Sequence, residues 1–365
     1  MVENEDLWVG APSGVPTHRF RRQKRGILQF VVRRIALLIV QVWGIVTVVF
    51  VLLKFLPGNP RYLLAGPLAT TQQINAITKQ LGLNQPAIIQ YLKYMWQLLH
   101  GNFGTSFFSQ TPVLQQIETR FPATLELVTA SFILILVLAI PLGVISAVSR
   151  HARKPIFLYG MVSGALPDFW WGLIVILVLY VHFHLGPAPV GQLGLLVTPP
   201  PTVTGLLTVD SVIAGDWQAF VSAVAHLVLP AITLAFVYGG QILKLTRSKV
   251  IVAMDSDYVR YARACGLPPR QVYIYALRNG LVPVLTLSGM TYCFLISGAV
   301  IIETIFSWGG MGQYAVQAIT NSDYFAITGS VIVFATFSLI VYVVMDILYA
   351  IVDPRVRYGR GAGGE

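Results

Sequence analysis

Six long apolar runs constrain the fold of this chain more than any other feature. Each run is about 20 residues long, the length of helix that crosses a bilayer core of about 30 Å. Only 11% of the 365 residues are charged, against roughly 25% in a soluble domain. We therefore expect an all-α polytopic membrane protein with six transmembrane helices, because a membrane β-barrel would show short alternating segments instead. The expected spans are 35–56, 123–148, 156–181, 226–243, 281–302 and 326–352.

The basic residues gather on one side of this six-span arrangement. Twenty of the 25 Lys and Arg residues lie on this side: before the first span, after the last span, or in the loops 149–155 and 244–280. The positive-inside rule therefore places both termini in the cytoplasm, as tails 1–34 and 353–365. The net charge of +10 is then a topology signal, and no nucleic-acid partner is indicated. The basic tail 1–34 does not have the pattern of a secretory signal peptide.

The outer segment 57–122 is predicted to form a small helical cap. Thr70 to Gln73 has the form of a capping box, and Pro86 is suited to begin a second helix. Spacing alone leaves two interpretations open, a cap that packs on the bundle or a docking surface for an external partner. The apolar face predicted for the second helix consists of Ile89, Leu92, Trp96 and Leu99.

The inner loop 244–280 is polar and lies between two apolar runs, and residues 257–267 within it have helical periodicity. One face of this helix carries aromatic and small side chains, and a neighbouring face carries arginines. A short helix of this kind is suited to insertion into a groove on a partner protein. The first face consists of Tyr258, Tyr261, Ala262 and Cys265, and the second of Arg260 and Arg263.

Four residues predict a tight turn after this helix. Gly266 can adopt the left-handed conformation that ends a helix, and Leu267 can pack back onto it. Pro268 and Pro269 then begin a second helix that leads into the fifth span. The loop is therefore expected to be an ordered helix–turn–helix.

The string DYVRYARACGL at 257–267 resembles the cytoplasmic EAA-type loop of ABC importer permeases. It is more similar to the dipeptide/oligopeptide/nickel branch, in its first-permease (B-type) form. Arg260 and Tyr261 stand where the general motif has Glu and Ala, so that only Ala262 matches its last Ala; this departure is typical of the peptide branch. Other strings similar to the family cover roughly 27–358: LPGNP at 56–60, LGLNQP at 81–86, GNFGTS at 101–106, RFPATLEL at 120–127, ETIFSW at 303–308, GGMG at 309–312 and DPRVRY at 353–358.

The resemblance implies a type I ABC importer transmembrane domain, with a five-helix permease core at 123–352. Such a permease imports di- or oligopeptides through the cytoplasmic membrane of a bacterium or archaeon by alternating access. Its partners are a second homologous permease, two cytoplasmic ATPases and an extracytoplasmic substrate-binding protein. The chain itself is expected to be non-catalytic and to bind no cofactor, because it contains no GxxxxGK[ST] phosphate loop; ATP and Mg would be bound by the ATPases. The residues implied to couple to them are Asp257, Tyr258, Arg260, Tyr261, Ala262, Arg263, Ala264 and Gly266.

Two alternatives remain on the sequence. The first is a permease of the same family for nickel or another small solute. The second, from another class, is an ion-coupled secondary transporter, which would show paired inverted repeats and several buried carboxylates. An intramembrane hydrolase is disfavoured, because Ser222 and His226 have no positioned third group. No metal site is expected, since the pair His182 and His184 has no third ligand placed by sequence.

Carboxylates inside the apolar runs are the other functional candidates. Asp168, expected near the middle of the third span, costs about 2.5–3.5 kcal/mol at the bilayer centre. We therefore expect it to face either a translocation path, where it would bind a cationic group such as a peptide amine, or a neighbouring helix as a polar link. Glu303 belongs either to an outer gate, as the family motif implies, or simply to the membrane interface. Glu126 is expected to be structural at the start of the second span, and Asp346 to pair with another helix.

Overall fold

The computed structural model describes residues 18–55, 70–80 and 84–352. Their regular structure is helical, with no strand among them, which confirms the all-α prediction. In chain order the helices are α1 (His18–Phe55), α3 (Thr71–Gln80), α4 (Ala87–Leu99), α5 (Val113–Val148), α6 (Arg150–Val162), α7 (Asp168–Val175), the π-helix η1 (Ile176–His182), α8 (Leu207–Ala214), α9 (Trp217–Met254), α10 (Asp257–Ala264), α11 (Pro269–Gly280), α12 (Val282–Ile305), α13 (Met311–Thr320) and α14 (Tyr324–Val352).

Five helices among the described residues are long and apolar enough to cross a membrane. They agree with five of the six spans expected from the sequence. The crossing segments are Val31–Leu52, Val113–Val148, Trp217–Met254, Val282–Ile305 and Tyr324–Leu348.

The third span, expected at 156–181 with a kink at Pro167, is interrupted there and not merely kinked. The segment is broken at 163–167, between α6 and α7, which leaves a shorter apolar helix, Asp168–His182. Pro167 explains the break, because proline has no N–H for the helix ladder and its ring disfavours helical conformation in Leu166 before it. Asp168 therefore lies in the first turn of α7 and not in the middle of a helix.

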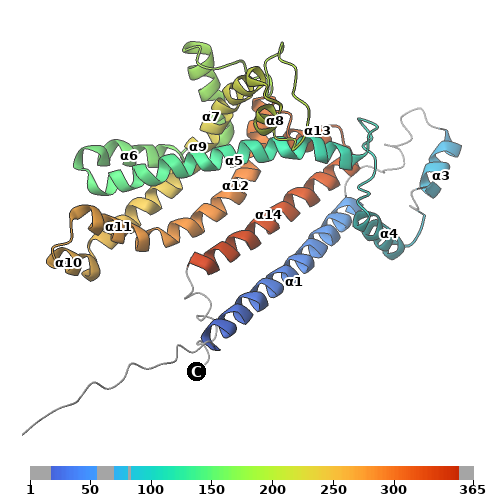
Figure 1. Ribbon diagram of the computed structural model, residues 1–365. Coiled ribbons are helices and arrows are strands. Elements are labelled where there is room, and N and C mark those ends of the chain that lie inside the picture. The colour runs from blue at the N-terminus through green and yellow to red at the C-terminus, as the bar shows by residue number, and fades with distance from the viewer. Residues whose placement is uncertain (1–17, 56–69, 81–83, 353–365) are drawn as a thin grey trace, which may run out of the picture.

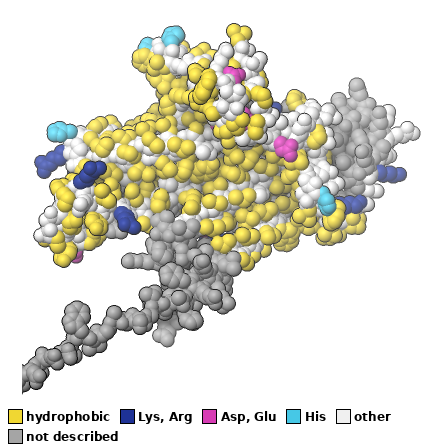
Figure 2. All heavy atoms as spheres, viewed as in Figure 1, with side chains coloured by type: hydrophobic (Ala, Val, Ile, Leu, Met, Phe, Trp, Pro, Cys, Tyr) yellow, Lys and Arg dark blue, Asp and Glu magenta, His cyan; other side chains and the backbone are white. Residues whose placement is uncertain are grey.

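In Figure 1 the helices α12, α14 and α1 run roughly side by side, with α5 along the upper edge of this group. Helices α5 and α9 form an extensively packed pair. The pair packs closely at Gly143, where an added Cβ would lie 2.7 Å from Cβ of Thr246. Helix α12 contacts both members of the pair, and α1 packs against α14. Helices α10 and α11 lie at one end of the bundle, while α4 and α13 lie at the other. Apolar side chains cover the middle of the face in Figure 2, and most Lys and Arg in view lie toward the two ends, as a bilayer requires.

The expectations about the ends of the chain and about two prolines within the spans have different outcomes. Helix α1 begins at His18, so the segment 1–34 expected as a tail is partly helical. Residues 1–17 and 353–365 lie outside the described residues, and a cytoplasmic location of both termini stays a prediction. Pro141 and Pro230 are also expected to kink their spans; they lie inside the continuous helices α5 and α9, and the kinks stay predictions.

The outer cap is present as α3 and α4, but α4 turns a different face to the bundle than expected. Tyr91 bonds the hydroxyl of Thr47 at 2.8 Å, and the rings of Tyr91 and Tyr94 pack on Phe50 of α1. The predicted apolar face, represented by Trp96 at 65% exposure, is directed away from the described helices. Helix α4 is thus attached to α1 through its tyrosines.

Candidate functional site

The inner loop folds around a small core of its own. Val259 and Ala262 of α10 are buried against Val272 and Ala276 of α11 and Ala253 at the end of α9, and Met254 and Leu267 pack at the edge. The core connects α10 to two longer helices. The ordered helix–turn–helix predicted from the sequence is therefore present.

The turn between α10 and α11 has the geometry that its residues predict. Gly266 has φ of +75°, a conformation that glycine adopts without steric cost. The N–H of Leu267 donates to the carbonyl of Ala262 at 3.2 Å, as in a Schellman cap, and Pro269 begins α11. Leu267 packs back onto the loop core, as expected.

The outer surface of α10 is polar and exposed. Asp257, Arg260, Tyr261 and Ala264 follow one another at helical spacing, and all four are exposed. Tyr261 has 73% of its surface exposed. The pair of Arg260 and Asp257, at 3.6 Å, is also exposed, so it contributes little to stability. These side chains are free to contact a partner, and we call the four residues the α10 stripe.

Ala262 does not belong to this surface. Helical spacing placed it beside Tyr258 and Tyr261, but it is 8% exposed and packs inside the loop core. Tyr258 and Cys265 are exposed, as are Arg263 and Gly266. The predicted partner face is therefore divided, because Ala262 holds the loop together while its neighbours point outward.

Asp168 is positioned by three helices. Its Oδ2 accepts a hydrogen bond of 2.7 Å from the hydroxyl of Tyr238 in α9, and an added Cβ on Gly298 of α12 would lie 3.0 Å from the same oxygen. The carboxylate is half-buried. The carboxylate therefore links helices, which was one of the two alternatives from the sequence. Part of its surface remains exposed, where a ligand could contact it.

Glu303 is fully buried at the outer end of α12. Its Oε1 accepts from Thr124 Oγ1 at 2.6 Å and its Oε2 accepts from the N–H of Gln313 at 3.0 Å. A Cβ on Gly310 would lie 2.6 Å from the carboxylate carbon, so glycine is needed where the N-terminus of α13 meets Glu303. The carboxylate caps α13, where the helix dipole favours a negative charge. It is buried in the bundle and not exposed at the membrane interface.

Glu126 caps a different helix from the one expected. It lies within α5, and its two oxygens accept from the N–H groups of Leu207 and Thr208 at 2.9 and 2.8 Å. These are the first residues of α8. The structural role was predicted correctly, but the helix N-terminus is that of α8. The sequence does not predict this contact, because no local pattern connects residues that are 81 positions apart.

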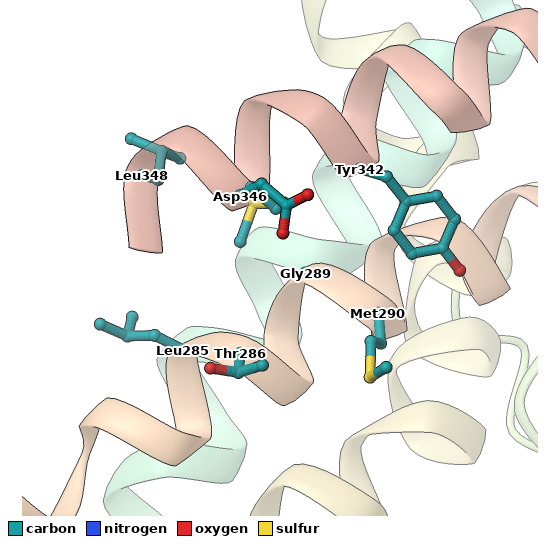
Figure 3. A pocket seen from close by; sticks show the side chains of 8 residues that line it. Leu285, Thr286, Gly289, Met290, Tyr342, Asp346 and Leu348 are labelled. Atoms are coloured by element: carbon teal, nitrogen blue, oxygen red, sulfur yellow. The ribbon is translucent and has the colours of Figure 1, made fainter. Parts of the chain in front are cut away.

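Asp346 pairs with another helix, as expected. Its Oδ2 lies 2.8 Å from Nη2 of Arg34 in α1. Asp346 also lines a cleft of about 290 Å³ between α12 and α14, shown in Figure 3, whose other walls are mainly apolar. Such a lining offers a peptide few hydrogen-bond partners.

The side chains considered for other chemistry do not form reactive sites. His226 Nδ1 bonds the carbonyl of Ser222 at 2.7 Å, while Ser222 Oγ accepts from the N–H of Gly194. The histidine is thus not placed to activate the serine hydroxyl. Within the described ranges, no three His, Cys, Asp or Glu side chains gather as metal ligands would.

Comparison with known families decides the class of the protein. The family described as "Binding-protein-dependent transport system inner membrane component" matches residues 139–358. The N-terminal family of the same transport membrane components matches residues 27–128. The chain belongs to this permease family. It is accordingly a multi-pass ABC transporter permease, the membrane component of a system that also comprises a binding protein and an ATPase.

Several similar proteins align with most of the length of the permease. It is 39% identical over 329 residues to the probable D,D-dipeptide transport system permease protein DdpB of Escherichia coli strain K12, covering 89% of this chain and 96% of the relative. It is 37% identical over 341 residues to the dipeptide transport system permease protein DppB of the same strain, covering 91% and 99%. It is 34% identical over 333 residues to the oligopeptide transport system permease protein AppB of Bacillus subtilis strain 168, covering 90% and 99%.

Proposed function

We propose that this permease imports di- or oligopeptides by alternating access, driven by ATPase subunits that bind the α10–α11 loop. The substrate class is supported by the names of the relatives, which are dipeptide, D,D-dipeptide and oligopeptide permeases. These names favour peptides over the nickel alternative. A second permease would complete the pore, and the ATPases would hold ATP and Mg.

The observation that carries the coupling proposal is the contrast within α10 between its buried and exposed sides. Val259 and Ala262 fix the helix to the loop core, whereas the α10 stripe is exposed. A short helix that is packed on the loop core and presents Arg and Tyr outward is suited to a groove, because these residue types are enriched at the energetic centres of interfaces.

The loop is also connected to the membrane helices in a way that could transmit movement. Gly280 at the end of α11 approaches α9 so closely that an added Cβ would lie 3.3 Å from the carbonyl oxygen of Lys249. Only Leu281 separates α11 from α12. A displacement of α10 by the ATPase would therefore move α9 and α12 together, as rigid-body switching requires.

The test is binding of the ATPase subunits to the full-length permease in detergent. Tyr261→Ala and Arg260→Glu change exposed side chains, so the loop is expected to fold while affinity falls about 30-fold, the loss typical of a hot-spot residue. Lys154→Glu, on the exposed start of α6, is the matched control on the other inner loop and should bind as the wild type does. Unchanged affinity in both α10 variants would reject the α10 stripe as the ATPase contact.

A further inference from the structure

Four carboxylates lie within the apolar stretches of the long helices and α7, and three of them have partners that match a negative charge. Glu126 and Glu303 accept backbone N–H groups at helix N-termini, and Asp346 pairs with Arg34. Asp168 accepts from the neutral hydroxyl of Tyr238. Among the residues that the structure describes, no cationic side chain pairs with it. The first turn of α7, in which Asp168 lies, favours its negative charge, but no cation of the described residues pairs with it.

The backbone beside Asp168 must be covered by water or protein. Residues 164–167 form the irregular break between α6 and α7, and all four are exposed. The break lies near the bilayer centre, because Gly239, next to Tyr238, packs against Ile135 and Ala139 in the middle of the apolar part of α5. Non-helical backbone at this depth is tolerated only in protein or along a water-filled cavity. Asp168 is therefore at a surface that lipid does not cover.

Aromatic side chains surround the same place. The ring of Trp171, one turn after Asp168, lies 4.5 Å from that of Phe236 in α9, and Tyr159 packs on Phe236 from α6 at 5.1 Å. The Nε1 atom of Trp171 is buried and has no hydrogen-bond partner within the described part of the chain. A carboxylate beside aromatic rings is the chemistry that binds an ammonium group.

We propose that Asp168, oriented by Tyr238, receives the amino-terminal ammonium of the peptide during its passage through the permease. The proposal rests on the proposed function and names the part of the substrate that this site would bind. A free peptide amine is mostly protonated at neutral pH, since its pKa is about 7.7–8.0. The break at 164–167 would let the ammonium approach the carboxylate from the aqueous path.

The test uses the complete transporter in proteoliposomes with its binding protein, and measures peptide transported per ATP hydrolysed. Asp168→Asn is expected to lower this ratio about tenfold for a dipeptide with a free amine, as loss of one charge-assisted hydrogen bond predicts. For the des-amino analogue, supplied at a concentration that saturates the binding protein, Asp168→Asn and wild type should give the same ratio. Asp168→Glu should restore most of the ratio for the free amine.

Asp346→Asn is the matched control, because it removes a different embedded carboxylate and should leave both ratios unchanged. Equal ratios for Asp168→Asn and wild type with the free amine would overturn the proposal, and so would an equal loss with both peptides. If Asp168→Asn no longer binds the second permease, Asp168 would instead be assigned to the interface between the two permeases. If Asp168→Asn does not assemble, Tyr238→Phe carries the same comparison with a smaller expected loss. Failure of the proposed function would be distinct, because wild type itself would show no ATP-dependent peptide uptake.

Discussion

Several charged side chains are buried at the outer end of the bundle, whereas those on the loop at its inner end are exposed. At the outer end, Glu303 and Glu126 are buried and hold the N-termini of α13 and α8. Asp323, also buried, accepts from Ser106 Oγ at 2.5 Å and from the N–H of Ala326 in the first turn of α14. At the inner end, Asp257 and Arg260 of the α10 stripe are exposed and contact mainly each other.

This difference shows at which end the charged groups find their partners within the chain itself. The outer carboxylates cross-link helices that are distant in sequence, and their hydrogen bonds are satisfied without another subunit. The inner loop has a core of small side chains and leaves its charges and tyrosines outward. We infer that the outer end is a rigid frame, whereas the inner loop is built to be completed by a partner.

The largest expected effect comes from breaking the outer frame at Glu303. Glu303→Ala would leave the hydroxyl of Thr124 and the N–H of Gln313 without their acceptor in the interior. The free energy of unfolding should fall by about 3 kcal/mol, because charge-assisted hydrogen bonds are lost and buried donors remain unpaired. Thermal unfolding of the purified permease in detergent measures this loss.

Glu118→Ala is the control for Glu303. Glu118 lies in the outer part of α5 and is exposed, so its removal should change stability by less than about 0.5 kcal/mol. Equal melting temperatures for the two variants would show that the outer carboxylates do not form a frame.

A smaller and more local effect is expected from the core of the inner loop. Ala262→Asp would place a carboxylate among apolar side chains, at a cost of about 2 kcal/mol or more. Hydrogen exchange of the α10 amides should then rise about 30-fold, while the melting temperature of the bundle changes less than in Glu303→Ala. Ala264→Asp, on the exposed side of the same helix, should leave this exchange near the wild-type rate. Equal exchange in the two variants would contradict an independent loop core.

Local signals in the sequence predicted the inner loop well. Gly266, Leu267 and Pro269 act on their immediate neighbours, so their effect on the backbone can be derived from the chain alone. The burial of Ala262 could not be derived in this way, because helical spacing groups residues on a face without saying whether that face meets another helix or solvent.

The outer frame was not predictable, because its contacts join distant segments. Glu303 and Thr124 are 179 residues apart, and Glu126 reaches Thr208 across 82. Gly310, next to the buried carboxylate, was the available signal, but only the packing of α12 against α13 reveals why it is needed. Pro167 inside an apolar run predicted a kink in the third span, but not that the helix is interrupted over 163–167.

The smallest expected effect is a pH dependence at Asp210, which organises the outer loop before α8. Burial by itself would raise the pKa of Asp210, but hydrogen bonds from the hydroxyl and N–H of Thr204 and from the N–H groups of Val203 and Gly205 outweigh it and lower the pKa below its ordinary value. A lowered pKa in the folded state stabilises the protein fully above the unfolded pKa of about 3.9, and the contribution is lost as the pH falls through the folded pKa. Asp210→Asn should therefore be less stable than wild type at pH 7, and this gap should narrow below about pH 4. Thr204→Val, which removes one hydrogen-bond donor to Asp210, should show a smaller loss of stability of the same sign. A difference in stability between variant and wild type that widens as the pH falls would contradict a lowered pKa of Asp210.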